Sequence, residues 1–332
     1  MRAMNLDVKN NRYSYLELII SCTIFGSSGI FLTHISGMQT SSILFYRILF
    51  GFILLVSYII ATKKYNLFQI GKKRYLLLLI GIFNVVTTYS YYSSIKYSGL
   101  SVAVLLLYTA PIYVTLLSPL FLKEKMTLRG IISLLVSMIG ISMVVVPGNG
   151  SLGLNSHLLP GLIFGLISGL SYSGTIMTVN HLKDEYSGTA QLFWSTFISL
   201  IILMPFASKV PQAVLMPNLP VLVLFGLMTT AFASLLYLNS ASKISAQTVS
   251  VLALLEPVSG IIFGFFFLHE PVIMKTIQGC IFILFGACIL VWDNRMMQLY
   301  GIKDPFMSFR TTVKGKLLDI SRITFMWLSA KY

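Results

Sequence analysis

Two ionisable side chains lie deep inside apolar stretches of this sequence, where a charge is expensive to bury. Arg47 lies about nine residues into the stretch 39–61, and Glu256 about ten residues into the stretch 246–268. If both stretches are helices that cross a bilayer, each side chain is roughly 14 Å deep. Glu256 could then bind a proton or a solute amine while Arg47 faces a solute carboxylate. A structural ion pair or polar anchor is the alternative interpretation, and it stays open.

Two prolines, Pro111 and Pro257, interrupt apolar stretches at matching positions. Proline has no backbone N–H, so inside a helix it leaves the carbonyl four residues earlier without its usual partner. Interruptions at corresponding positions of two halves of a chain indicate a transporter's binding site. We therefore predict a cavity around Tyr108 and Glu256, with the two prolines as hinges. A static kink is the alternative.

Further polar side chains fall within the apolar stretch 74–95. Asn84, Thr88 and Tyr91 or Tyr92 are spaced by three or four residues, so they share one face of a helix. Lipid cannot satisfy their hydrogen-bonding groups, and this face is therefore expected to line the interior. Ordinary helix packing is the alternative for each residue taken singly. The predicted solute-binding set is Arg47, Asn84, Thr88, Tyr91, Tyr92, Tyr108 and Glu256.

The elements that hold these residues are expected to be membrane helices. The chain has 332 residues, of which 56% are hydrophobic and only 10% charged, whereas a soluble domain carries about 25% charged residues. About 20 apolar residues cross a bilayer, and polar breaks such as Pro211 with Pro217 separate ten such runs. The fold class predicted is therefore all-α integral membrane, with transmembrane helices at 14–36, 39–61, 74–95, 98–121, 128–146, 159–180, 189–208, 219–241, 246–268 and 274–292.

The distribution of lysine and arginine predicts the orientation. With both termini cytoplasmic, twenty of these residues fall on the inner side and only three, Lys96, Lys209 and Lys275, on the outer side. Positive residues favour the cytoplasmic side of a membrane, so we expect a multi-pass protein of the cell membrane. This placement also accounts for the formal charge of +14 without a nucleic-acid partner.

The two halves of the chain match each other at an offset of 146 residues. Pro111 aligns with Pro257, Glu124 with Glu270, and Gly140 with Gly286. Five helices per half is an odd number, so the second copy is expected to enter the membrane inverted, an arrangement typical of secondary transporters. The predicted divisions are a cytoplasmic N-terminal segment, two five-helix repeats and a basic cytoplasmic tail, at 1–13, 14–146, 159–292 and 293–332.

The chain resembles the EamA-type branch of the drug/metabolite transporter superfamily over about residues 14–292. The matching features are Phe45-Tyr46-Arg47, Leu255-Glu256-Pro257, Phe267 to Glu270, and the arrangement of five plus five helices. The resemblance implies a ten-helix bundle with cytoplasmic termini and a central cavity, and often the export of amino acids or other small metabolites. The basic tail departs from the family pattern, and its role is unexplained.

Our leading hypothesis is a secondary transporter that moves amino acids or related amphipathic solutes, in the direction of efflux, by alternating access. Protons are a possible coupling ion. No phosphate-binding loop, HExxH motif or zinc spacing is present, so we expect neither an enzyme nor a cofactor. The glycines at 161, 165 and 169 allow close packing within the chain or at a homodimer seam. A non-transporting sensor or assembly partner, or an intramembrane enzyme, is the alternative.

Overall fold

The computed structural model describes residues 2–98, 100–124, 127–145, 158–269 and 272–300. The chain divides into two units, Met1–Leu290 and Val291–Tyr332, and the features below belong to the first. Most of the basic tail predicted at 293–332 lies outside the described residues, as do Glu270 and the loop after residue 145.

The regular structure of the described residues is helical. The half that corresponds to the first predicted repeat contains α1 (Arg2–Gly26), α2 (Ser28–Thr33), α3 (Thr40–Ala61), η1 (Tyr65–Phe68), α4 (Arg74–Ser98), α5 (Leu100–Leu107), α6 (Ala110–Phe121) and α7 (Leu128–Val145). The other half contains α8 (Leu158–His181), α9 (Gly188–Leu203), η2 (Met204–Lys209), α10 (Gln212–Phe225), η3 (Gly226–Ala233), α11 (Ser234–Ala241), α12 (Ala246–Leu252), α13 (Leu255–Leu268) and α14 (Met274–Tyr300).

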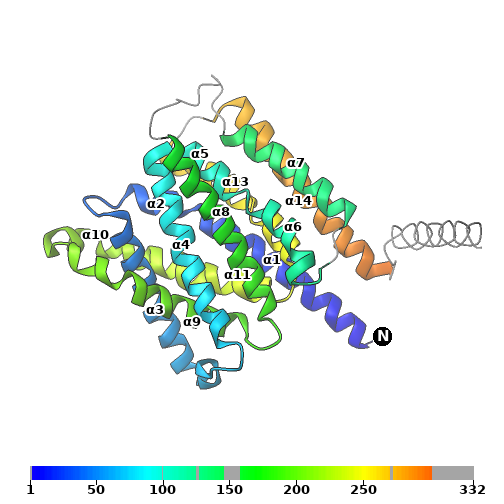
Figure 1. Cartoon of the computed structure of the whole chain (residues 1–332), viewed down its shortest axis with the longest axis horizontal. Helices are drawn as coiled ribbons and strands as arrows, with labels where there is room; N and C mark the ends of the chain where they lie inside the picture. Colours follow the sequence, from blue (N-terminus) through cyan, green and yellow to red (C-terminus); the bar gives the residue numbers. More distant parts are fainter. Residues whose placement is uncertain (1, 99, 125–126, 146–157, 270–271, 301–332) are drawn as a thin grey trace, which may run out of the picture. The chain divides into compact units, whose positions relative to one another are not determined.

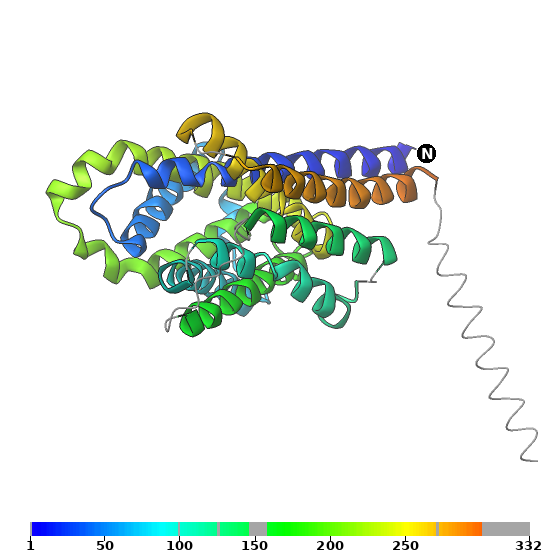
Figure 2. The same ribbon diagram turned by 90° about the horizontal axis from the view of Figure 1, so that it is seen from above.

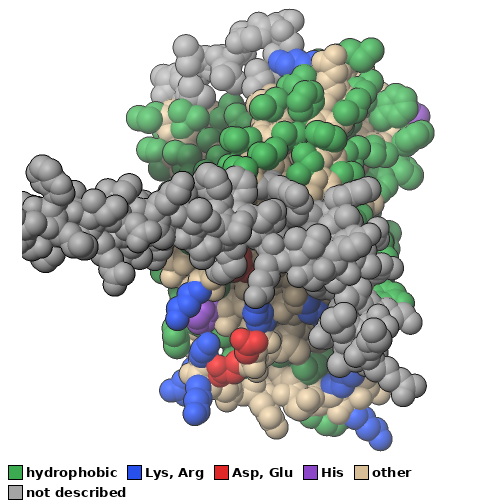
Figure 3. All heavy atoms as spheres, turned by 90° about the vertical axis from the view of Figure 1, so that its right-hand side faces the viewer, with side chains coloured by type: hydrophobic (Ala, Val, Ile, Leu, Met, Phe, Trp, Pro, Cys, Tyr) green, Lys and Arg blue, Asp and Glu red, His purple; other side chains and the backbone are tan. Residues whose placement is uncertain are grey.

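Eight helical segments among the described residues are long and apolar enough to cross a membrane. Two shorter apolar helices, Gly130–Val145 and Met274–Ile289, occupy corresponding places in the two halves. These ten segments overlap the ten runs predicted from the sequence. Large hydrophobic side chains also remain on their outer surfaces, where Phe266 is 67% exposed. Figure 3 shows hydrophobic side chains over much of one face, with Lys and Arg gathered mainly toward one end.

The span Gln212–Ala241 corrects one prediction. Pro217 was expected to lie in a polar break between helices, but it lies within a helix. Pro217 and Pro220 both lie inside α10, and the span runs from Gln212 to Ala241. The neighbouring Asn218 supports this turn: its Nδ2 donates to the carbonyl oxygens of Val214 and Ser36, at 2.8 and 2.9 Å. Its Oδ1 accepts from the Ser36 backbone N–H at 3.2 Å. Figures 1 and 2 both show the loop between α2 and α3 beside α10.

The two spans that contain Pro111 and Pro257 are both broken. Tyr108 and Thr109 separate α5 from α6, and Ala253 and Leu254 separate α12 from α13. The two breaks are separated by the repeat offset of 146 to within one residue. In each case the proline lies in the first helical turn after the break. The backbone continues through short i→i+3 bonds, such as Leu254 N to Val251 O at 3.1 Å. The prolines therefore accompany interruptions of the helix rather than simple kinks.

Each broken span packs against the first helix of the other half. Helix α1 lies on α13, and α8 lies on α5 and α6; Figure 1 also shows α8 beside α4. A β-carbon on Gly26 would stand 2.7 Å from the Glu256 carbonyl oxygen, and one on Gly169 would stand 2.5 Å from the Leu106 carbonyl oxygen. Glycine is needed at both positions because backbone meets backbone. The glycines of α8 therefore serve packing within the chain, and the homodimer stays a prediction.

Candidate functional site

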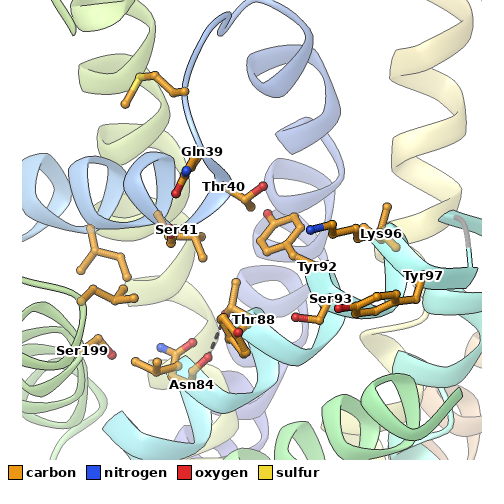
Figure 4. Close-up of a pocket in the computed structure, with 17 residues that line it drawn as sticks. Gln39, Thr40, Ser41, Asn84, Thr88, Tyr92, Ser93, Lys96, Tyr97 and Ser199 are labelled. Carbon is orange, nitrogen blue, oxygen red and sulfur yellow. Dashed lines mark hydrogen bonds between the residues drawn. The ribbon is translucent and has the colours of Figure 1, made fainter. Parts of the chain in front are cut away.

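A cavity of about 580 Å³ lies between the start of α3, the second half of α4 and the end of α9. Its apolar wall comes from residues such as Leu44, Ile48 and Leu203. Figure 4 shows its polar side chains. These are Gln39, Thr40, Ser41, Asn84, Thr88, Tyr92, Ser93, Lys96, Tyr97 and Ser199. A space with one apolar wall and several convergent polar groups is the usual form of a small-molecule site.

Helix α4 provides the polar stripe along this cavity. Asn84, Thr88, Tyr92 and Lys96 recur every four residues, so their side chains follow one face of the helix. The Thr88 hydroxyl donates to the Asn84 backbone carbonyl at 2.8 Å (Figure 4). That bond satisfies the hydroxyl hydrogen and leaves the Asn84 carboxamide facing the cavity. Three residues of the predicted solute-binding set are thus brought together here.

The remaining ionisable candidates form a second group beside the cavity. Tyr108, in the break before α6, donates a side-chain hydrogen bond to the Glu256 carboxylate in the first turn of α13. Arg47 interacts electrostatically with Glu256 and with Tyr92. Its guanidinium carbon lies 5.1 Å from the centroid of the Phe225 ring, a cation–π distance. The group therefore joins both broken spans to α3.

The expected pairing of Arg47 with Glu256 is indirect. Within the described residues these two side chains form no ion pair shorter than 4 Å, in contrast to Lys243 and Glu17 at 3.6 Å. The Arg47 Nε is buried and has no hydrogen-bond partner in the described structure. Because a buried unpaired donor is costly, this atom is a ready donor for an anionic group.

Tyr92 connects the two groups. Its side chain lines the cavity, and it interacts electrostatically with Arg47 and Glu256. Tyr91 packs against Tyr92, with ring centroids 5.4 Å apart, but it is not part of the cavity wall. The structure therefore brings the predicted residues into one cavity and one adjoining polar group rather than into a single pocket. Their role in solute binding stays a prediction.

The far ends of the broken spans are tied together. Glu124, just after α6, accepts a hydrogen bond from the Ala246 backbone N–H at the start of α12, at 3.0 Å. The Gln247 side chain donates to the Ser118 hydroxyl at 3.0 Å. We call these two contacts the α6–α12 seal. Burial raises the pKa of Glu124, while hydrogen bonds from the Ala246 and Gln247 backbone and the charge of Lys183 act in the opposite direction.

Sequence reasoning missed part of the cavity wall. Ser199 continues the four-residue spacing of Gln191 and Ser195 in α9, a signal that was not used, whereas Gln39 belongs to a connection before a helix and carries no pattern of its own. Lys96 could have been found, because α4 continues to Ser98 and extends the stripe that begins at Asn84, and Ser93 lay within the predicted helix next to Tyr92. The helix was predicted to end at residue 95.

These observations define the class of protein. Apolar helices that can cross a membrane, interrupted at corresponding positions of two halves beside a polar cavity, make the chain a multi-pass membrane protein. The EamA-like transporter family matches residues 12–146 and again residues 159–292, so the chain belongs to that family. It is a membrane transporter for a small solute, and not an enzyme.

The relatives below align with most of the chain. It is 26% identical to an uncharacterized transporter of Archaeoglobus fulgidus over 84% of this chain and 96% of that one. It is 25% identical to the uncharacterized transporter YxxF of Bacillus subtilis, over 86% and 91%. A crystal structure with 12% sequence identity superposes with a TM-score of 0.72 over 86% of this chain and 98% of the other. That likeness supports the fold alone.

Proposed function

We propose that the chain is a secondary transporter that moves amino acids or related amphipathic metabolites out of the cell, across the cell membrane, by alternating access. Its moving parts are two inverted five-helix repeats, 14–146 and 159–292, with both termini in the cytoplasm. The proposal extends the family assignment to a substrate class, a direction and a mechanism.

The observation that carries the proposal is that the helix bundle differs on the two sides of the broken spans. On one side lies the cavity, where α4 ends and α9 ends. On the other side Glu124 and Gln247 close the ends of α6 and α12. A solute site open on one side and sealed on the other is one of the two states that alternating access requires. In the proposed orientation, Lys96 marks the outer side, so this is the outward-facing state.

The composition of the cavity supports an amphipathic solute. Leu44 and Ile48 can cover an apolar group, while the Asn84 carboxamide offers both a donor and an acceptor. Arg47 supplies the nearest buried cation, with its Nε unpartnered. In this scheme Arg47 faces a carboxylate, and Glu256 binds an amine or a proton. An amino acid carries both groups.

The inverted repeat is supported by which helices meet. Helix α1 contacts α13, and its counterpart α8 contacts α6, so each repeat closes on the broken span of the other. Because the two contacts are equivalent, the same local movement at either contact can switch the chain between a packing open to one side of the membrane and a packing open to the other. Pro111 and Pro257, each in the first turn after a break, act as the hinges.

Counterflow in proteoliposomes tests this function. Liposomes that contain the purified protein would be preloaded with a panel of unlabelled metabolites, and uptake of labelled amino acids and amines would be followed. We expect saturable exchange. Binding without exchange, by correctly folded protein, would favour a sensor or assembly partner, and chemical conversion of the solute would favour an enzyme.

A further inference from the structure

Helices α4 and α9 pack against each other. They meet where Gly81 faces Ile198, since a β-carbon on Gly81 would stand 2.6 Å from the Ile198 Cβ. Beyond that contact lies a groove of about 390 Å³, with a wall that includes Leu78 and Phe197. Leu78 is 49% exposed and Phe197 39% exposed. The groove therefore opens to the lipid-facing surface and is separate from the solute cavity.

One end of the groove carries positive charge. Arg74 lines it and is the first residue of the candidate span Arg74–Ser98, so it lies at the level where the membrane begins. In the part of the chain that the structure describes, no carboxylate forms an ion pair with Arg74. Its neighbour Lys73 differs, because its backbone N–H donates to Glu185 at 2.9 Å and its Nζ lies 3.3 Å from His181.

The wall of the groove also holds an unsatisfied donor. Trp194 lines it, and the indole Nε1 is buried with no hydrogen-bond partner among the described residues. A buried N–H in this position calls for an acceptor. Tryptophan is enriched near the membrane interface, where one edge of the ring meets polar lipid groups.

We propose that this groove binds one anionic glycerophospholipid of the bilayer. Its phosphate would lie on Arg74, an ester oxygen would accept from the Trp194 indole, and an acyl chain would follow Leu78 and Phe197 toward the Gly81 contact. Basic pockets between membrane helices are known to hold anionic lipid headgroups. The bound lipid fills the groove between α4 and α9 and thereby stabilises their packing.

Lipid retention and thermal unfolding of the full-length protein test the site. Wild type and variants would be placed in nanodiscs of phosphatidylcholine, with or without phosphatidylglycerol, and bound lipid counted by native mass spectrometry. Arg74→Gln removes the charge, and Leu78→Trp fills the groove while leaving Arg74 in place. The matched controls are Lys123→Gln, an exposed cation after α6 that does not line the groove, and Leu170→Trp, a leucine of α8 that is 51% exposed.

We expect wild type and both controls to retain one phosphatidylglycerol and to unfold at higher temperature when it is present. Arg74→Gln should weaken that retention about fivefold, the effect of one cation near an anionic lipid surface. Leu78→Trp should abolish it without lowering stability in phosphatidylcholine alone. Equal retention by wild type, Arg74→Gln and Leu78→Trp would overturn the proposal, as would equal retention of phosphatidylcholine by wild type.

Discussion

Gly140 of α7 and Gly279 of α14 lie in direct backbone contact. A β-carbon on Gly140 would stand 2.7 Å from the Gly279 carbonyl oxygen, and one on Gly279 would stand 2.6 Å from that of Gly140. Their counterparts at the repeat offset of 146 are Gly286 and Ser133, and the Ser133 hydroxyl donates to the Gly286 carbonyl at 2.6 Å. The same two helices thus meet through two equivalent pairs, as a two-fold relation between the repeats requires.

The glycine contact gives a prediction about stability. Gly140→Ala should destabilise the protein by about 1–3 kcal/mol, because its methyl group has no room beside a backbone carbonyl and the helices must move apart. Gly260→Ala is the matched control, since its nearest neighbour, the Gly26 carbonyl oxygen, is at an ordinary 3.5 Å. Thermal unfolding in detergent compares them. A Gly140→Ala protein as stable as Gly260→Ala would contradict the contact.

The cavity gives a prediction about solute affinity. Asn84→Ala should raise the KM for exchange about two- to tenfold, the effect of losing one hydrogen bond to the solute. Ser142→Ala is a suitable control, because the Ser142 hydroxyl donates to the carbonyl of Ile139 in its own helix and Ser142 does not line the cavity. Concentration-dependent counterflow measures both. If Asn84→Ala leaves KM unchanged, the cavity on α4 is not the solute site.

Glu256 gives a prediction about proton coupling. Glu256→Gln keeps the size of the side chain and an acceptor for Tyr108, but it cannot exchange a proton. Uptake driven by a pH gradient should therefore be lost, while solute counterflow persists. The two assays on one preparation separate coupling from folding. Driven uptake that survives in the variant would remove Glu256 from that role.

Glu124 gives a prediction about pH. Burial raises the pKa of Glu124. The neutral Glu124 carboxyl group therefore stabilises the fold fully at pH below the ordinary carboxyl pKa, and this stabilisation is lost as the pH rises through the raised pKa. Glu124→Gln keeps an oxygen to accept from Ala246 and removes the buried charge. The variant should be more stable than wild type at neutral pH, and the difference should shrink on acidification. Unfolding temperatures from pH 4 to 8 would reveal it; a difference that grows in acid contradicts the assignment.

The sequence predicts the helices well and the contacts between them poorly. Apolar runs mark the spans, and Pro111 with Pro257 marks the breaks, because both signals are local. The prediction that Pro217 belongs to a loop was wrong, and the bond of the neighbouring Asn218 to Ser36, a residue 182 positions away, is not visible in the local sequence. The bond of Glu124 to Ala246 also joins distant residues, and Ser199 reaches the cavity only through the packing of α9 on α4.

Alternating access requires the α6–α12 seal to open during transport, and a reversible cross-link tests whether it does. Ser118→Cys and Gln247→Cys would be combined in a chain whose native cysteines, Cys22, Cys280 and Cys288, are replaced by alanine. Single-cysteine chains serve as controls. Counterflow would be measured before oxidation, after oxidation and after reduction. We predict that the cross-link stops exchange and that reduction restores it. Exchange at an unchanged rate in fully cross-linked protein would contradict alternating access at this seal.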